Sequence, residues 1–176
     1  MKKIVVKKRH SIRKGQAQSL LARLADEIGG PFSRESPMTG FIDPTKETFA
    51  AFRQNDRPGP IQMLNLVRLR ERAAYPDARQ ATGAEAYAAY GRESAPVFAR
   101  LGGAVIWRGK FELTLIGPAE ERWDHCFIAQ YPSVDAFVAM IRDPAYREAV
   151  KHRQAAVEDS RLIRLAALAP GENFFE

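Results

Sequence analysis

The stretch that decides the fold runs from Ile61 to Leu69 and reads Ile-Gln-Met-Leu-Asn-Leu-Val-Arg-Leu. It is a nearly continuous apolar run with the length of a strand, which is typical of a strand packed on both faces. One amide, Asn65, interrupts the run near its middle. We therefore predict a strand over residues 61–69 and regard Asn65 as its most informative side chain.

Strong capping signals mark the helices around this strand. Thr82 and Glu85 form a capping box, and Gly102-Gly103 is a left-handed stop for the same helix, within which Pro96 should produce a kink. Asp43-Pro44 predicts the start of a helix that precedes the strand. The predicted helices run from residue 43 to about 54, from 82 to about 101, from 134 to 141, and from 143 to about 157.

The remaining apolar runs read as strands. Residues 104–108 and 111–117 are expected to form one bent strand or a hairpin around Gly109. Further strands are predicted over residues 123–131 and 161–168. From residue 60 the order is then β-α-β-β-α-β, which is the α+β, ferredoxin-like topology: a four-stranded antiparallel sheet with helices on one face.

The net charge divides the chain into unequal parts. Residues 1–37 carry the whole formal charge of +6, whereas the basic and acidic residues from 38 onward balance. A Pro- and Gly-rich stretch from residue 31 to 40 reads as a linker. We therefore expect four parts: a basic N-terminal extension over 1–37, a lead-in helix and turn over 38–59, a ferredoxin-like domain over 60–168, and a tail over 169–176. The extension is either natural or appended, and we expect a short strand over 4–6 and a helix over 14–28 within it.

Composition excludes several classes of protein. The single cysteine, Cys126, excludes an intrachain disulfide and a multi-cysteine metal site. The three histidines have no metal-ligand spacing, so we expect neither a metal nor a cofactor. No apolar run approaches a membrane span and no secretory signal is visible, which favours a cytoplasmic protein. Nucleic-acid contact would depend on residues 1–37 alone, and a solvated tail is preferred because aromatic residues are not interleaved there.

The predicted sheet has an apolar side without a cover. Residues 61–69 and 126–129 are apolar at both parities, yet the helices cover one face. Soluble monomers rarely expose so large an apolar patch. We therefore predict a homodimer that forms through the open sheet face.

A set of motifs in order along residues 41–166 resembles the family called domain of unknown function (DUF) 1330. The motifs are Pro60 to Arg68, Tyr87-x-x-Tyr90-Gly91, Leu101-Gly102-Gly103, Ile116-Gly117-Pro118, Glu121-Arg122-Trp123-Asp124, Tyr131-Pro132-Ser133, Asp143-Pro144-x-Tyr146 and Asp159 to Ile163. The resemblance implies a ferredoxin-like fold that pairs as a dimeric α/β barrel. Relatives with that architecture include cofactor-free monooxygenases, lactone isomerases, haem-degrading enzymes and plain ligand binders, and the family has no agreed reaction.

Four residues are candidates for a site. An amide such as Asn65 in an apolar strand either orients a ligand or pins a neighbouring loop. His125 is the best general-base candidate, against a structural histidine. Tyr90 either packs in the core or hydrogen-bonds a substrate oxygen. Arg153 on an apolar helix face either snorkels, pairs with Glu158 or Asp124, or clamps an anion.

Other reactive side chains are given structural interpretations. Cys126 lies in a predicted strand without a basic neighbour, which favours an inert thiol. His152 lies one residue off the apolar stripe of its helix and is expected to be solvated. The sequence thus favours a small-molecule-binding protein that is either a cofactor-free monooxygenase- or isomerase-like enzyme acting on a small organic acid or carbonyl compound, or a non-catalytic binder or sensor.

Overall fold

The computed structural model of the chain describes residues 40–171 and 173. The predicted strand over 4–6, the predicted helix over 14–28 and the basic segment 1–37 lie outside the described residues. The predictions that follow residue 40 are compared with the structure below.

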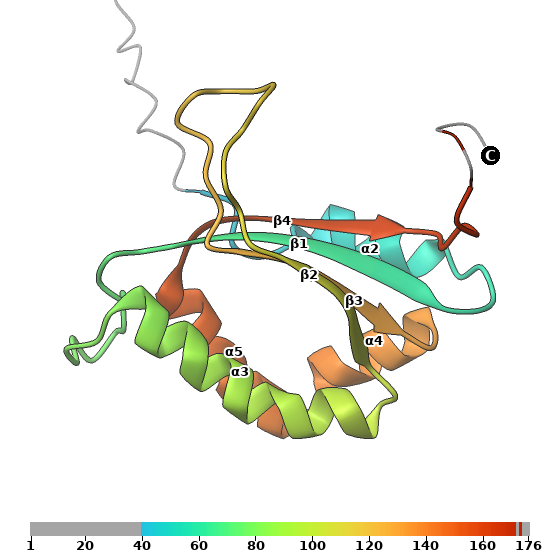
Figure 1. Cartoon of the computed structure of the whole chain (residues 1–176). Coiled ribbons are helices and arrows are strands. Elements are labelled where there is room, and N and C mark those ends of the chain that lie inside the picture. The colour runs from blue at the N-terminus through green and yellow to red at the C-terminus, as the bar shows by residue number, and fades with distance from the viewer. Residues whose placement is uncertain (1–39, 172, 174–176) are drawn as a thin grey trace, which may run out of the picture. The chain divides into compact units, whose positions relative to one another are not determined.

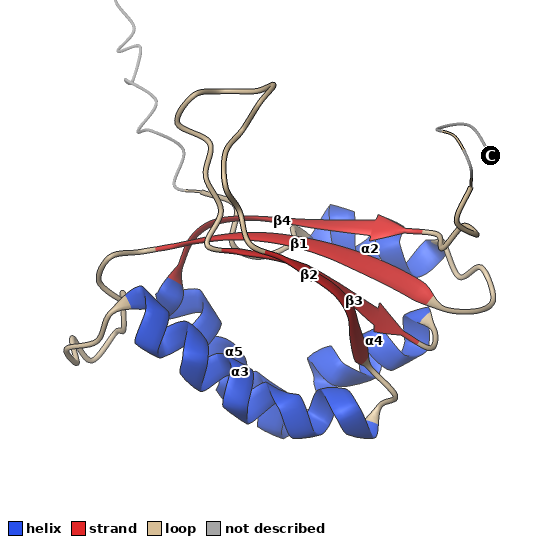
Figure 2. Cartoon of the chain, viewed as in Figure 1, coloured by secondary structure: helices blue, strands red, loops and turns tan. Residues whose placement is uncertain are grey.

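Four antiparallel strands form one sheet in the order β2-β3-β1-β4 (Figure 2). The strands are β1 (Ile61–Leu69), β2 (Ala104–Gly109), β3 (His125–Tyr131) and β4 (Val157–Leu165). The prediction for β1 is confirmed at both ends, and β1 is a central strand that pairs with β3 and β4. Apolar side chains are needed on both faces of such a strand, which explains its continuous apolar run.

Within the described residues four helices accompany the sheet: α2 (Lys46–Gln54), α3 (Gly83–Arg100), α4 (Val134–Arg142) and α5 (Pro144–Ala156). Helices α3, α4 and α5 lie together on one face of the sheet (Figure 1). Helix α2 is attached to β4, since Arg164 Nη1 donates to the backbone carbonyls of Phe52 and Asn55. The element order and the antiparallel sheet make this an α+β, ferredoxin-like fold, as predicted.

The capping signals at both ends of α3 are confirmed. Thr82 and Glu85 form the predicted capping box of α3. Gly102 has φ 75°, its N–H donates to the Ala99 carbonyl, and the Gly103 N–H donates to the Phe98 carbonyl, which is a Schellman stop. Helix α3 continues through Pro96 as one element. Helix α2 begins later than predicted, because Thr45 rather than Asp43 accepts the free N–H of its first turn.

The core lies between the sheet and α4 with the end of α3. Strand side chains that point to the helices are buried together with side chains from these helices. The buried core residues are Ile61, Met63, Val97, Ala129, Tyr131, Val134, Phe137, Val138 and Met140. This cluster fixes one sheet face against the helices.

The opposite face of the sheet carries apolar side chains at its centre, as the sequence predicted, and a hydrogen-bonded pair, Gln62 and Gln130, lies beside them. Leu64 lies between Ile128 of β3 and Ile163 of β4, and Trp107 of β2 pairs with Ile128, so these side chains share a face. We call this surface, with Leu66, the open face. Trp107 and Ile163 are 49% and 44% exposed.

The prediction of a strand over residues 111–117 is wrong. Strand β2 stops at Gly109, which pairs with Cys126 near the start of β3, so no sheet neighbour is left for the residues that follow. Residues 110–124 instead form a long loop that rises from the open side of the sheet (Figure 2). Alternating Phe111, Leu113 and Leu115 imitate the period of a strand without a partner to pair with.

Two strand boundaries also differ from prediction. Strand β3 begins at His125, not at residue 123. Strand β4 begins at Val157, directly after α5, four residues before the predicted start. The first part of β4 contains the polar run Glu158-Asp159-Ser160, which does not have the apolar pattern of a strand. Asp159 and Ser160 are nevertheless buried.

The segment from Gly40 to Asp43 explains this burial. The Phe41 N–H donates to Asp159 Oδ1 at 2.8 Å, and Ser160 Oγ donates to the Phe41 carbonyl at 2.7 Å. A Cβ atom added at Gly40 would lie 2.2 Å from the Glu158 carbonyl oxygen. We call residues 40–43 the strap, since they run directly against the start of β4.

Candidate functional site

Two of the predicted site residues meet in a row of rings on the helix side of the sheet. His125 of β3 stacks on Tyr87 of α3, with ring centroids 4.7 Å apart and planes 19° apart. Tyr87 lies 5.5 Å from Tyr90, and the Tyr90 hydroxyl lies 3.3 Å from that of Tyr146 on α5. We call these four side chains the aromatic row. It joins β3, α3 and α5.

His125 is the reactive member of this row. It is half-buried, and burial lowers the pKa of its imidazole below the ordinary value, with Arg108 acting in the same direction and Asp124 against it. Among the described residues, no hydrogen bond to its ring nitrogens is formed. The row therefore presents a neutral imidazole with a free donor and a free acceptor at physiological pH.

Two tyrosines of the row, Tyr87 and Tyr146, keep their protons at neutral pH. Burial raises the pKa of Tyr87 and of Tyr146 above the ordinary phenol value, and the nearby Tyr90 hydroxyl acts in the same direction on both. The pKa of the neighbouring Tyr131 is raised by burial too. These phenols are hydrogen-bond donors and acceptors at neutral pH rather than nucleophiles.

Asn65 faces the same side of the sheet as the row, but its amide is used locally. It pairs with Phe127 and Leu162 in the sheet and is half-buried. Its Nδ2 donates to the carbonyl of Met63 at 2.8 Å, within the same strand. The interpretation that this amide pins a neighbouring loop is therefore wrong, and its Oδ1 atom and the second Nδ2 hydrogen are left for another partner.

Arg153 does not reach the aromatic row with a free guanidinium. Its Nη1 donates to the Ile42 carbonyl at 2.6 Å and lies 3.4 Å from Asp43 Oδ1, while its Nη2 donates to Ser160 Oγ at 3.1 Å. The side chain is 13% exposed. The predicted internal ion pair forms, but with Asp43 of the strap and not with Glu158 or Asp124.

His152 is not solvated as expected. Its Nδ1 lies 2.5 Å from the Tyr75 hydroxyl, and its Nε2 lies 3.3 Å from Glu93 Oε2. Arg79 in turn stacks over the Tyr75 ring at 4.4 Å. This contact attaches the loop between β1 and α3 to both long helices, a role that helical spacing alone did not indicate.

Cys126 lies on the open face, opposite Leu66, and burial raises the pKa of its thiol. A raised pKa lowers the thiolate fraction at neutral pH. This agrees with the interpretation of an inert thiol.

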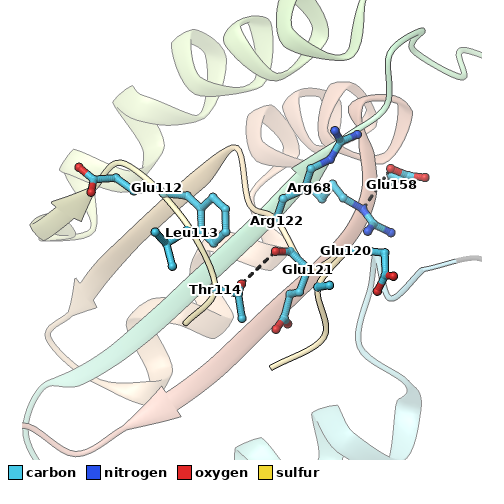
Figure 3. A pocket seen from close by; sticks show the side chains of 10 residues that line it. Arg68, Glu112, Leu113, Thr114, Glu120, Glu121, Arg122 and Glu158 are labelled. Carbon is cyan, nitrogen blue, oxygen red and sulfur yellow. Dashed lines mark hydrogen bonds and ion pairs between the residues drawn. The ribbon is translucent and has the colours of Figure 1, made fainter. Parts of the chain in front are cut away.

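Two hollows of the described residues lie elsewhere, at the foot of the 110–124 loop, and Figure 3 shows the larger of them. The larger, of about 600 Å³, is lined by Arg68, Phe111, Glu112, Leu113, Thr114, Ala119, Glu120, Glu121, Arg122 and Glu158. Arg68 pairs there with Glu158 at 3.1 Å. Neither hollow touches Asn65, Tyr90, His125 or Arg153.

The second hollow is lined by charged side chains and one indole. Arg161 lies 2.7 Å from Asp159 and places its guanidinium 5.4 Å from the Trp123 ring. Sequence reasoning missed this region, since it assigned residues 111–117 to the sheet. The charged run Glu120-Glu121-Arg122 beside an apolar stretch was the available signal.

Comparisons with known proteins identify relatives of the chain. A family model described as a domain of unknown function (DUF1330) matches residues 77–165, which is half of the chain. The chain is 77% identical in sequence to the methylated RPA0582 protein. The crystal structure of that protein matches with a TM-score of 0.75, and the match covers 77% of this chain and 100% of that one. A second structure, of the RPA0582 protein of unknown function from Rhodopseudomonas palustris, is also 77% identical, with a TM-score of 0.73 and coverage of 75% and 100%.

A more distant similarity is to a protein of unknown function from Bacteroides fragilis that is described as dimeric and ferredoxin-like. It is 13% identical, with a TM-score of 0.39, and the match covers 60% of this chain and 94% of that chain. No curated protein matches the chain. In the part of the chain that the structure describes, none of the helices has the length and hydropathy to span a membrane.

Proposed function

We propose, since the chain belongs to the DUF1330 family of domains of unknown function, that it binds a small organic molecule at the aromatic row. The observation that carries the proposal is His125: a half-buried imidazole, stacked on Tyr87, without a hydrogen-bond partner among the described residues. Its ring nitrogens are not fully buried, so they are open to a partner from outside the chain. A ligand that accepts from or donates to this ring would satisfy it.

The chemistry of the row favours a carbonyl or phenol compound. Tyr90 and Tyr146 supply hydroxyl groups, and the ring faces suit a flat, partly apolar molecule. The Asn65 Oδ1 atom is a further acceptor on the same side of the sheet. Arg153 is a positioning residue in this proposal, because the strap and Ser160 already occupy its guanidinium.

Two functions share this site. In an enzyme of the cofactor-free monooxygenase or isomerase type, the neutral His125 would accept a proton from the ligand, and the tyrosine hydroxyls would stabilise the resulting oxyanion. In a binder or sensor, the same groups would hold the ligand without proton transfer. A rate that rises with the ionisation of a group near the pKa of His125 would favour the enzyme.

Protein-observed NMR of the histidine ring resonances, with a panel of small phenols, aldehydes and oxo acids added in turn, tests the proposal. A true ligand moves the His125 ring resonances, and its affinity falls at least tenfold in H125Q and Y90F. H152Q is the matched control, because His152 belongs to the separate contact with Tyr75 and Glu93. The proposal fails if no compound moves the His125 resonances, or if H125Q binds the compounds as the wild type does.

We also propose that the protein is a homodimer that pairs through the open face. The exposed side chains of Trp107, Ile163 and Leu165 on this face support the proposal, because two copies packed face to face would remove them from water. Light scattering at micromolar concentration tests it, and a monomer would refute it.

A further inference from the structure

The loop of residues 110–124, which we call the arm, carries three apolar side chains that are mostly exposed to solvent. Leu113 is 67% exposed, Leu115 is 87% exposed and Ile116 is 94% exposed. The arm rises from the open side of the sheet, away from α3 and α5 (Figure 1). An isolated exposed leucine needs no explanation, but three of these residues at one tip do.

The arm is ordered without a core of its own. Thr114 Oγ1 donates to the Glu121 carbonyl at 3.0 Å and so ties the two limbs together. The Glu121 N–H donates to the Pro118 carbonyl at 3.1 Å, which closes a turn near the tip. At the foot, the Asp124 N–H donates to the Val67 carbonyl, and Asp124 Oδ2 accepts from the Leu69 N–H at 2.7 Å. A braced hairpin-like projection is therefore fixed to the central strand.

The length of the arm sets what it reaches. One limb, from residue 110 to 116, spans about 20 Å when extended. Two packed sheets lie about 10 Å apart. An arm that leaves the open face therefore extends past the sheet of any copy packed on that face, and its tip lies beside the partner rather than between the two sheets.

We propose that the arm of each copy clasps a second copy of the chain, with Leu115 and Ile116 against the apolar edge of the partner's sheet. The inference rests on the proposed homodimer. The same chain offers both halves of the contact, since Val105, Ile106 and Leu162 are 48%, 45% and 42% exposed at the two edge strands. A two-fold axis forms this contact twice, as isologous dimers require.

The clasp gives the hollow at the foot of the arm a second wall. That hollow opens on the side of the sheet where the partner stands, and Phe111 and Leu113 of the arm line it together with Arg68 of β1 (Figure 3). In the monomer it is an open groove of about 600 Å³. In the clasped dimer the partner bounds it, so the compartment belongs to both copies.

Cross-linking tests the clasp directly. A benzophenone amino acid replaces Ile116 in the full chain, heavy-isotope and unlabelled protein are mixed, and the irradiated sample is analysed by mass spectrometry. We expect heavy-to-light cross-links from position 116 to β2 or β4. Cross-links within one chain only, the absence of any cross-link in a sample that light scattering shows to be dimeric, or binding of the arm to phosphatidylcholine vesicles instead would overturn the proposal.

A pair of variants measures the contribution of the tip. L115S/I116S is expected to raise the dimer dissociation constant at least tenfold, because four apolar side chains per dimer lose their burial. L168S, a leucine 89% exposed outside the arm, is the control and should leave the constant unchanged. A wild-type protein that is monomeric removes the proposed homodimer and the clasp together, whereas a dimer that L115S/I116S leaves intact removes the clasp alone.

Discussion

Arg153 on α5 holds Ile42 of the strap, with Nη1 2.6 Å from the Ile42 carbonyl oxygen. R153A should lower the free energy of unfolding by about 2–3 kcal/mol, because it removes a charged donor and leaves the Ser160 hydroxyl and the Ile42 carbonyl without this partner. Chemical denaturation followed by circular dichroism measures the change. R147A, on the exposed side of the same helix, is the control, and an R153A variant as stable as R147A would contradict the role assigned here.

Replacing Gly91 or Gly102 by alanine should change the stability of the protein in opposite directions. G102A places a Cβ at φ 75° and 2.8 Å from Pro132 Cγ, so it should destabilise the protein by about 1–2 kcal/mol. G91A lies within α3 with open space around the added Cβ, so it should stabilise by about 0.5–1 kcal/mol. Thermal unfolding of both variants checks the pair, and equal shifts would contradict the assigned stop at Gly102.

The lowered pKa of His125 makes stability depend on pH. Burial disfavours the charged imidazole in the folded state, so the unfolded chain takes up this proton first as the pH falls through the ordinary histidine pKa of 6.5. The contribution is therefore present above that pH and is lost on acidification. Between about pH 7 and pH 5.5, above the ordinary carboxylate range, H125Q should show a flatter loss of stability than the wild type.

The control for this prediction is H152Q, whose pH dependence over the same interval should retain the His125 contribution. NMR titration of the His125 ring gives the pKa itself. A value above that of a histidine in an unfolded peptide would show that the sign is wrong.

The contact between Tyr75 and His152 should couple a loop to two helices. In a double-mutant cycle, Y75F and H152A are expected to interact by about 0.5–1 kcal/mol, as a partly exposed hydrogen bond does. Amide exchange in residues 70–81 should speed up in Y75F, because that loop loses one attachment. Additive effects of the two substitutions would indicate that the contact contributes nothing to stability.

The parts of the fold that follow local rules were predictable from the sequence. The run 61–69 and the capping box at Thr82 specify their elements through periodicity and backbone hydrogen bonding, and both were confirmed to the residue. The arm was not predictable in this way. A period-2 apolar pattern is shared by a paired strand and by a hairpin that exposes its side chains, and only the position of the neighbouring strand distinguishes them.

The candidate site was predictable only in its parts. His125 was selected from residue type and strand parity and Tyr90 from its place on the long helix, and the structure joins the two through Tyr87. The partner of Arg153 was not, because Asp43 lies far away along the chain and belongs to a segment without regular structure. Contacts of this kind depend on tertiary packing, which neither spacing nor propensity encodes.

The strap has a consequence for how sheets of different molecules meet. Exposed outer strands are templates for runaway strand addition, which leads to fibrils. Gly40 approaches the Glu158 carbonyl so closely that an incoming foreign strand has no room at the beginning of β4. On the far side, the register shift between Val105 and Trp107 breaks the regular ladder of β2. Both edge strands, β2 and β4, therefore resist fibril growth even though exposed apolar side chains lie along them.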